Sequence, residues 1–201
     1  MKGFKGEFKM KFVCIGDSLT QGYGVDCDAC WVSILNRITS HHFINKGKNG
    51  ETSGEILNRF EKDVVMEHPD YSIIFCGVND YIYSTNDEIS AFQHVKKMCD
   101  MAVKYNIQPI IGIPFLTIPE LAQRYWADNT DYLKVNQQIL SYRKYLMDYA
   151  QDKKIKYLDL YPLFQEKIIE IGEMKLFTDG LHLTNLGHEL IAECIKRELT
   201  L

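Results

Sequence analysis

The chain has 201 residues, of which 46% are hydrophobic and 25% are charged, and its formal net charge is −4 at pH 7. This length and composition are typical of one globular domain, and we expect a single domain over residues 1–201. The acidic balance argues against a nucleic acid as the partner, because nucleic-acid-binding domains carry a basic face.

The N-terminal segment, residues 2–11, carries four lysines and resembles the start of an export signal. The apolar run that follows is short and stops at Gly16, so we expect a solvated tail instead. No stretch of the sequence approaches the roughly 18 apolar residues of a membrane span, which predicts no stable membrane insertion and a cytoplasmic protein. In that compartment the six cysteines are expected to be reduced thiols.

Strand-like and helix-like segments alternate along the chain. Short apolar runs predict strands over residues 12–15, 43–45, 72–76, 109–113 and 155–160. Helical periodicity predicts helices over residues 31–38, 52–68, 129–152 and about 186–195, and one that begins near residue 85. Capping boxes, Thr52 with Glu55 and Thr85 with Glu88, mark two helix starts. Strands joined by helical crossovers indicate an α/β fold with a five-stranded parallel sheet, and residues 161–184 are expected to form a short helical patch and a loop.

Residues that directly follow the strands are candidates for a site, because ligands of an open parallel sheet bind beyond the carboxyl ends of its strands. The first strand is followed by Gly-Asp-Ser-Leu at residues 16–19, and the third by Gly-Val-Asn-Asp at residues 77–80. A loop with two glycines, residues 45–52, follows the second strand, and Asp-Gly-Leu-His at residues 179–182 comes well after the last. We therefore expect these four segments to meet at one edge of the sheet.

Together these segments contain every group that acyl transfer needs: a nucleophile, a base, a residue that orients the base, and donors to the oxyanion. Ser18 lies in a tight turn after a strand, His182 can take its proton, and Asp179 can hold the imidazole in the right tautomer. The Asn79 side chain and the backbone N–H groups of Gly50 and Ser18 can donate to an oxyanion. Each residue alone is more often part of a turn or a structural side chain, but their joint occurrence favours a serine hydrolase.

The four segments resemble, in type and order, the four blocks of the SGNH/GDSL hydrolase family, and they span residues 16–182. The resemblance implies a flavodoxin-like three-layer α/β/α sandwich. It implies the roles of the site residues, which are a triad of Ser18, Asp179 and His182 and an oxyanion hole of Ser18, Gly50 and Asn79. In the second block Gly47 is an alternative to Gly50. We expect a cofactor-free GDSL-type esterase or acylhydrolase without a metal ion.

Several weaker signals point elsewhere. Cys27 and Cys30 form a C-x-x-C pair, but no second pair stands at zinc spacing, so a structural role is favoured over a surface disulfide. The glycine-rich residues 16–24 follow a strand, as phosphate-binding loops do, but they match neither the G-x-G-x-x-G pattern nor the Walker pattern. A flavodoxin-like protein that binds a nucleotide or a flavin is the non-enzyme alternative. His94 is expected to be exposed, and His188 to be a structural residue on the polar side of its helix.

Bulky side chains near the strand ends suggest a small substrate pocket. The candidates for substrate binding are Tyr81, Phe115 and Leu181, with Leu116, Ile118, Tyr125 and Trp126 also near this edge. Because such side chains occupy the space that a long acyl chain would need, we expect a small-molecule ester with a short acyl group. The alternatives are a lysophospholipase or long-chain thioesterase and a carbohydrate O-acetylesterase, and the oligomeric state is left open.

Overall fold

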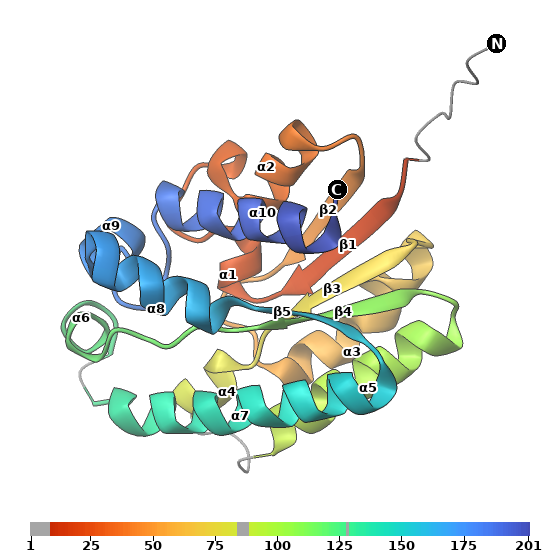
Figure 1. Cartoon of the computed structure of the whole chain (residues 1–201). Coiled ribbons are helices and arrows are strands. Elements are labelled where there is room, and N and C mark those ends of the chain that lie inside the picture. Colours follow the sequence, from red (N-terminus) through yellow and green to blue (C-terminus); the bar gives the residue numbers. More distant parts are fainter. Residues whose placement is uncertain (1–8, 84–88, 128) are drawn as a thin grey trace.

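The computed structural model describes residues 9–83, 89–127 and 129–201, and its centre is the five-stranded parallel sheet that the sequence predicts. The strands lie in the order β2-β1-β3-β4-β5, which is the flavodoxin-like order (Figure 1). Their bounds are β1 Lys11–Gly16, β2 His42–Gly47, β3 Tyr71–Phe75, β4 Gln108–Ile113 and β5 Lys156–Asp159. The chain moves from β1 outward to β2 and then returns past β1 to β3, so the order of strands reverses between β1 and β3. A ligand site is expected at that reversal.

Helices cover both faces of the sheet, so the predicted three-layer sandwich is confirmed (Figure 1). One face packs against α3 (Ser53–Asp63), α5 (Ser90–Lys104) and α7 (Tyr132–Lys153). The other face packs against α2 (Trp31–Ile38), α8 (Leu160–Ile171), α9 (Glu173–Leu176) and α10 (Asn185–Leu199). Both faces of the strands are therefore buried, which is why their sequences are continuous apolar runs and do not alternate.

Short helices stand at the carboxyl edge of the sheet. They are α1 (Ser18–Gln21), α4 (Val78–Ile82) and α6 (Pro119–Tyr125). Elsewhere in the described chain, 3-10 turns cover Cys27–Ala29 and Val65–Glu67. The sequence did not predict these three helices, because helices of one or two turns have too few residues to show a period. Among the helices that the structure describes, none combines the length and apolar character needed to span a bilayer.

The predicted helix at residues 31–38 is confirmed, and the helix predicted over residues 52–68 ends earlier than expected. The capping box of Thr52 with Glu55 is present, but α3 ends at Asp63 and a 3-10 turn takes over before Pro69. The capping box expected at Thr85 and Glu88 lies outside the described residues, and α5 is described from Ser90 onward.

The segment after β5 was predicted only in part. Leu160 opens helix α8 and does not end the strand, and the helical patch expected after it is longer than predicted, because α8 and α9 continue to Leu176. The reason is a helical spacing that stands inside an apolar run: Leu160 and Phe164 are four residues apart and both are buried against the sheet. The Asp159 carboxylate at this boundary is held by Arg143 of α7, with its Oδ2 at 2.6 Å from Nη2.

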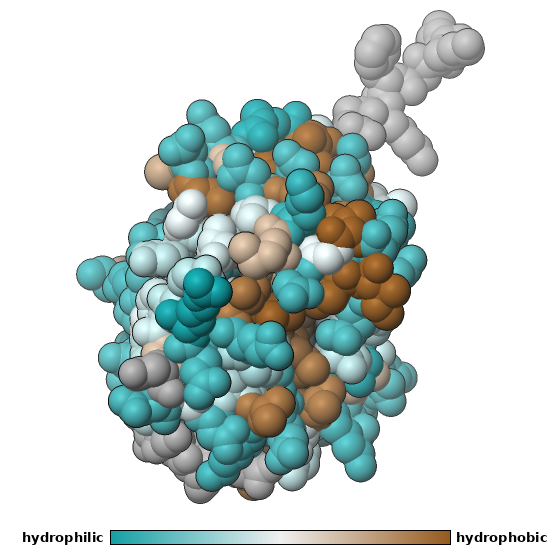
Figure 2. Space-filling view, turned by 90° about the vertical axis from the view of Figure 1, so that its left-hand side faces the viewer, coloured by the Kyte–Doolittle hydropathy of each residue, from teal (hydrophilic) through white to brown (hydrophobic). Residues whose placement is uncertain are grey.

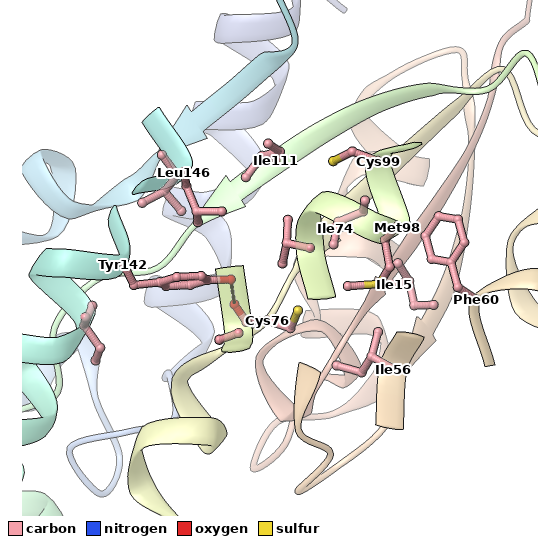
Figure 3. Packing of buried hydrophobic residues seen from close by; sticks show 14 of the residues in the cluster. Ile15, Ile56, Phe60, Ile74, Cys76, Met98, Cys99, Ile111, Tyr142 and Leu146 are labelled. Carbon is pink, nitrogen blue, oxygen red and sulfur yellow. Dashed lines mark hydrogen bonds between the residues drawn. The ribbon is translucent and has the colours of Figure 1, made fainter. Parts of the chain in front are cut away.

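A buried tyrosine fixes the position of the chain just beyond β3 (Figure 3). Tyr142 of α7 is 1% exposed, and its hydroxyl donates a hydrogen bond to the Cys76 carbonyl oxygen at 3.1 Å. The next residue, Gly77, has φ of 113°, and a Cβ built there would lie 2.7 Å from the Tyr142 ring. Only glycine combines this backbone angle with such close packing.

We expect Gly77→Ala to lower the free energy of unfolding by about 2–4 kcal/mol, because it adds left-handed backbone strain and an overpacked contact. Gly172→Ala is the matched control, since Gly172 has φ of 85° and no atom lies within 4 Å of the position that a Cβ would take there. It measures backbone strain without a packing contact, about 1–3 kcal/mol. Urea unfolding curves of the two variants measure the difference, and equal midpoints would contradict the packing role of Gly77.

All six cysteines are free thiols, and each lies within the described residues. Cys30 is buried with its Sγ 3.3 Å from the Thr20 carbonyl oxygen, whereas Cys27 is exposed. Burial raises the pKa of the Cys30 thiol, despite hydrogen bonds that act in the opposite direction. This thiol behaves as a small packed side chain, which agrees with the structural role predicted for the pair.

Candidate active site

Ser18 is held at the end of β1 by a tight turn. Asp17 caps α1 by accepting a hydrogen bond from the Leu19 N–H at 3.0 Å, which places Ser18 at the first position of the helix. Gly16 permits the turn, because a Cβ there would lie 2.1 Å from the Phe75 carbonyl oxygen. Burial raises the pKa of Asp17 to about 7, although the Leu19 N–H and the nearby His182 oppose this shift.

His182 and Asp179 come from the loop before α10 and meet Ser18. The His182 Nε2 lies 2.9 Å from the Ser18 Oγ, and its Nδ1 lies 2.7 Å from the Asp179 Oδ2. The other carboxylate oxygen, Oδ1, accepts hydrogen bonds from the N–H groups of Leu181 and His182 at 2.9 and 2.8 Å. Burial alone would raise the pKa of Asp179, but the hydrogen bonds from His182 and Leu181 outweigh it, and the pKa is lowered. An ionised Asp179 fixes the proton on Nδ1, so that Nε2 is free to accept the proton of Ser18.

Asn79 and Gly50 lie on the same pocket as Ser18. The Asn79 side-chain amide donates one hydrogen bond to the Glu51 carbonyl oxygen at 2.9 Å, which fixes the amide and leaves it a second N–H. Gly50 has φ of 75° in the intervening loop. Gly47 is not an alternative donor, because its N–H is bonded to the Asn45 side chain and it packs against the backbone of the chain at Gln21.

The pocket beside Ser18 is small and largely apolar, with a volume of about 170 Å³. It lies on the face where the strands end, and Figure 2 shows apolar patches among hydrophilic residues on this side of the molecule. The lining residues come from the four sequence segments, from residues shortly after the first and third of them, and from the residue that follows α6. They are Asp17, Ser18, Leu19, Tyr23, Asn49, Gly50, Val78, Asn79, Ile82, Tyr83, Trp126, Leu181 and His182. Of the candidates for substrate binding, Leu181 and Trp126 lie on this pocket.

Two expected substrate-binding residues belong to the core instead, and this is a correction. Phe115 is 4% exposed and stacks on Phe164 with ring centroids 4.0 Å apart. Tyr81 is 4% exposed and packs against Tyr142 with ring centroids 5.7 Å apart. Tyr125 is exposed and does not line the pocket.

A buried hydrogen-bond network joins α3 to α4 beneath the pocket. Asp80 accepts hydrogen bonds from the Ser53 N–H at 2.8 Å and from the Ser53 hydroxyl at 2.6 Å. The Ser53 Oγ also lies 2.9 Å from the His94 Nδ1, so His94 is partly buried and not exposed as predicted. His188 is likewise buried, not on a polar side, and burial together with the nearby His182 lowers its pKa to about 4.

Arg59 of α3 joins two of the segments that form the site, and sequence reasoning did not single it out. Its guanidinium donates to the Gly16 carbonyl oxygen at 3.0 Å and to the Lys46 carbonyl oxygen at 2.8 Å. It also pairs with Glu51 at 2.5 Å and with Asp63 at 2.9 Å. The signal available in the sequence was an arginine on the apolar face of this helix, between residues 56 and 60, and the structure shows that it is buried. Because the Glu51 carbonyl holds Asn79, Arg59 connects the serine turn to the loop of Gly50.

The structure gives no indication of a metal centre: in the described parts of the chain, no group of three or more His, Cys, Asp or Glu side chains is placed to hold a metal ion. The pocket is lined by the Ser18 hydroxyl, by the His182 imidazole, which is hydrogen-bonded to both Ser18 and Asp179, and by the Asn79 side-chain amide.

Comparison with known proteins identifies the family. The model of the GDSL-like Lipase/Acylhydrolase family matches residues 14–190. The chain is 25% identical to the isoamyl acetate-hydrolyzing esterase of Saccharomyces cerevisiae, with 90% of this chain and 82% of the relative covered, and 25% identical to the arylesterase of Vibrio mimicus, with 94% and 88% covered. A solved structure of a putative lipolytic protein of the G-D-S-L family from Desulfitobacterium hafniense aligns with a TM-score of 0.78 and 26% identity over 94% of this chain and 99% of that one. The chain therefore belongs to the GDSL-like lipase/acylhydrolase family, as its four sequence segments predict, and its reaction class is the hydrolysis of carboxylic esters.

Proposed function

We propose that the protein hydrolyses esters of short acyl groups through an acyl-enzyme intermediate on Ser18. The observation that supports this proposal most strongly is the hydrogen-bonded series from Ser18 Oγ to His182 Nε2, at 2.9 Å, and from His182 Nδ1 to Asp179 Oδ2, at 2.7 Å. This series lies on a pocket that also contains Gly50 and Asn79. A hydroxyl made nucleophilic by an oriented base, with oxyanion donors alongside, is the arrangement that acyl transfer requires.

In the proposed mechanism, the Ser18 Oγ bonds to the acyl carbon while its proton passes to His182 Nε2. The carbonyl electrons move to the oxygen, which the N–H groups of Ser18 and Gly50 and the second N–H of Asn79 stabilise. The carbon–oxygen bond to the alcohol then breaks, and the alcohol takes the proton from His182. Water attacks the acyl-enzyme with His182 again acting as base, which releases the acid and restores the Ser18 hydroxyl.

The size of the pocket supports a short acyl group. A cavity of about 150 Å³ lined by aliphatic and aromatic side chains holds one benzene molecule, with six carbons. The pocket here is of similar size, about 170 Å³, and is lined by Val78, Ile82 and Leu181 among others. We therefore propose acyl groups from acetyl to at most about hexanoyl, which also has six carbons and would fill the pocket if the alcohol took none of its volume.

A series of p-nitrophenyl esters from acetate to palmitate, assayed below micelle-forming concentrations, tests this proposal. Each methylene that finds a place in the pocket contributes about 0.8 kcal/mol, so kcat/KM should rise over the first few carbons and then fall once the pocket is full. A steady rise to palmitate would contradict a pocket limited to short acyl groups. It would favour the lysophospholipase or long-chain thioesterase alternative.

We expect Arg59→Met and Arg59→Lys to lower kcat by roughly 10- to 100-fold with little change in KM, because displacing catalytic groups by about 1 Å costs as much as 10²-fold. Neither side chain can bond at once to the carbonyl oxygens of Gly16 and Lys46 and to Glu51. Arg59 is thus a positioning residue that acts through the serine turn and through the Glu51 carbonyl that holds Asn79.

Arg143→Met is the matched control for the loss of an arginine ion pair, since Arg143 pairs with Asp159 at 2.6 Å and does not line the pocket. Urea unfolding of all three variants separates lost stability from lost activity. A positioning role for Arg59 requires a reduced kcat at temperatures where the variant is fully folded. Wild-type kcat in folded Arg59→Lys and Arg59→Met would refute it.

A further inference from the structure

Two aromatic rings flank the imidazole of His182. The Tyr23 ring centroid lies 4.4 Å from that of His182, with an interplanar angle of 45°. The Trp126 ring centroid lies 4.8 Å from it at 64°, and the two aromatic rings also contact each other at 5.8 Å. Tyr23 follows α1 and Trp126 ends α6, so segments that are distant in the sequence converge on the same histidine.

Both rings keep exposed surface in spite of these contacts. Tyr23 is 40% exposed and Trp126 is 41% exposed, and both line the pocket of Ser18. Covering a large aromatic side chain contributes a large binding free energy. Paired, half-exposed rings beside a catalytic pocket are therefore suited to an apolar ligand. These rings therefore offer an apolar surface next to the base.

The chemistry of the proposed reaction determines which part of the ester meets this surface. The leaving oxygen must come within hydrogen-bond distance, about 2.6–3.2 Å, of His182 Nε2 to receive its proton. The first carbons of the alcohol then lie next to the groups that flank His182. The carbonyl oxygen points instead toward Gly50 and Asn79, the proposed oxyanion donors. The acyl chain is the third substituent of the reacting carbon and leaves it in a different direction from the alcohol, so the two are directed to different walls of the pocket.

We infer that Tyr23 and Trp126 form the binding face for the alcohol part of the ester, and that this alcohol is apolar, either alkyl or aryl-alkyl. The inference rests on the proposed function, because it requires His182 to protonate the leaving group. A sugar alcohol fits this face less well, since its hydroxyl groups need several polar partners. In this pocket Asp17 and His182 are already bonded to protein groups, and the second N–H of Asn79 is the proposed oxyanion donor.

The test compares kcat/KM for acetate esters of methanol, 3-methylbutanol and 2-phenylethanol, which are alcohols of similar intrinsic reactivity. The value of kcat/KM reports acylation, the step in which the alcohol leaves. The wild-type enzyme should prefer the two larger alcohols over methanol. Trp126→Ala and Tyr23→Ala should each reduce that preference about tenfold, in line with the loss of an aromatic contact and the apolar area it covers. Trp126→Phe keeps an aromatic ring and should retain most of the preference.

Ile82→Ala is the matched variant, since Ile82 lines the same pocket from α4, on the side of Asn79. It should change the ratio of butyrate to acetate hydrolysis with one common alcohol, whereas Trp126→Ala should leave that ratio unchanged. This crossed result would assign the alcohol and the acyl group to separate walls.

Two outcomes would overturn the inference. One is an alcohol preference that stays within twofold of wild type in both Trp126→Ala and Tyr23→Ala. The other is a preference for an acetylated xyloside over every apolar ester, with that preference lost in Trp126→Ala, because it would assign the rings to a carbohydrate. In either case the Ser18-dependent hydrolysis of simple esters would persist, whereas failure of the proposed function would abolish it.

Discussion

Ser18→Ala is expected to lower kcat for a short-chain ester by roughly 10⁶-fold, the loss found when the nucleophile of a serine hydrolase is removed. The substitution deletes only the hydroxyl that lies 2.9 Å from His182 Nε2. The Asp17 cap of α1 does not involve this hydroxyl, so the turn should keep its shape. The loss should therefore appear in activity and not in the urea unfolding midpoint.

A fluorophosphonate probe provides a direct measurement, because it forms a covalent bond only with an activated serine. The probe should label the wild-type protein once, at Ser18, and should not label Ser18→Ala. Ser33→Ala, on helix α2 and outside the pocket, is the control that should label normally. A folded Ser18→Ala protein with undiminished ester hydrolysis would rule out the acyl-enzyme mechanism.

The parts of the site that the sequence predicted are those set by the sheet itself. Ser18 and Asn79 directly follow strands that are adjacent in space, and a parallel sheet brings the carboxyl ends of adjacent strands together. His182 is far from its strand in the chain, so its place was predicted less directly, from the joint occurrence of the four segments and from the resemblance to a family. The structure brings its side chain to Ser18 through the short Phe177–Leu183 bridge, which closes the loop of Asp179.

Tyr81 was misplaced because the residues after β3 were expected to form a loop. They form α4, and one helical turn sorts neighbouring side chains onto different faces. Val78 and Ile82, four residues apart, share the face that lines the pocket, whereas Tyr81 points to the core and meets Tyr142. A helix this short has no detectable period, so the sequence could not distinguish these faces.

Phe115 was misplaced for a different reason. It stands just beyond β4, where Pro114 ends the strand, and there the alternation of side chains between faces no longer applies. Its aromatic partners, Phe164 and Phe177, come from segments about 50 or more residues away, which the sequence pattern does not link to it. Arg59 was missed for the same reason, since its acceptors are carbonyl oxygens at the ends of two strands.

The second large effect is expected for Asp179→Asn, which keeps the shape of the side chain and changes only one hydrogen-bonding group. The Oδ1 of Asp179 accepts two backbone N–H groups, from Leu181 and His182. An asparagine must place its carbonyl oxygen at that position to keep both bonds, so its amide NH₂ faces His182 Nδ1. Nδ1 is then forced to accept, and the imidazole proton moves to Nε2.

In this tautomer Nε2 cannot take the proton of Ser18, so kcat should fall by roughly 10⁴-fold while the protein stays folded. The same exchange in the triad of a trypsin-like serine protease has an effect of this size. The ¹⁵N shifts of the His182 ring provide the independent readout, since the protonated nitrogen should change from Nδ1 in wild type to Nε2 in the variant. Fluorophosphonate labelling should slow in parallel, because an unactivated Ser18 remains present.

The control is Asp131→Asn, which alters a carboxylate that caps α7 outside the pocket of Ser18 and should leave kcat unchanged. Activity of Asp179→Asn within tenfold of wild type would mean that the carboxylate does not set the tautomer. The hydrogen bond between Asp179 and His182 would then serve only to hold the loop.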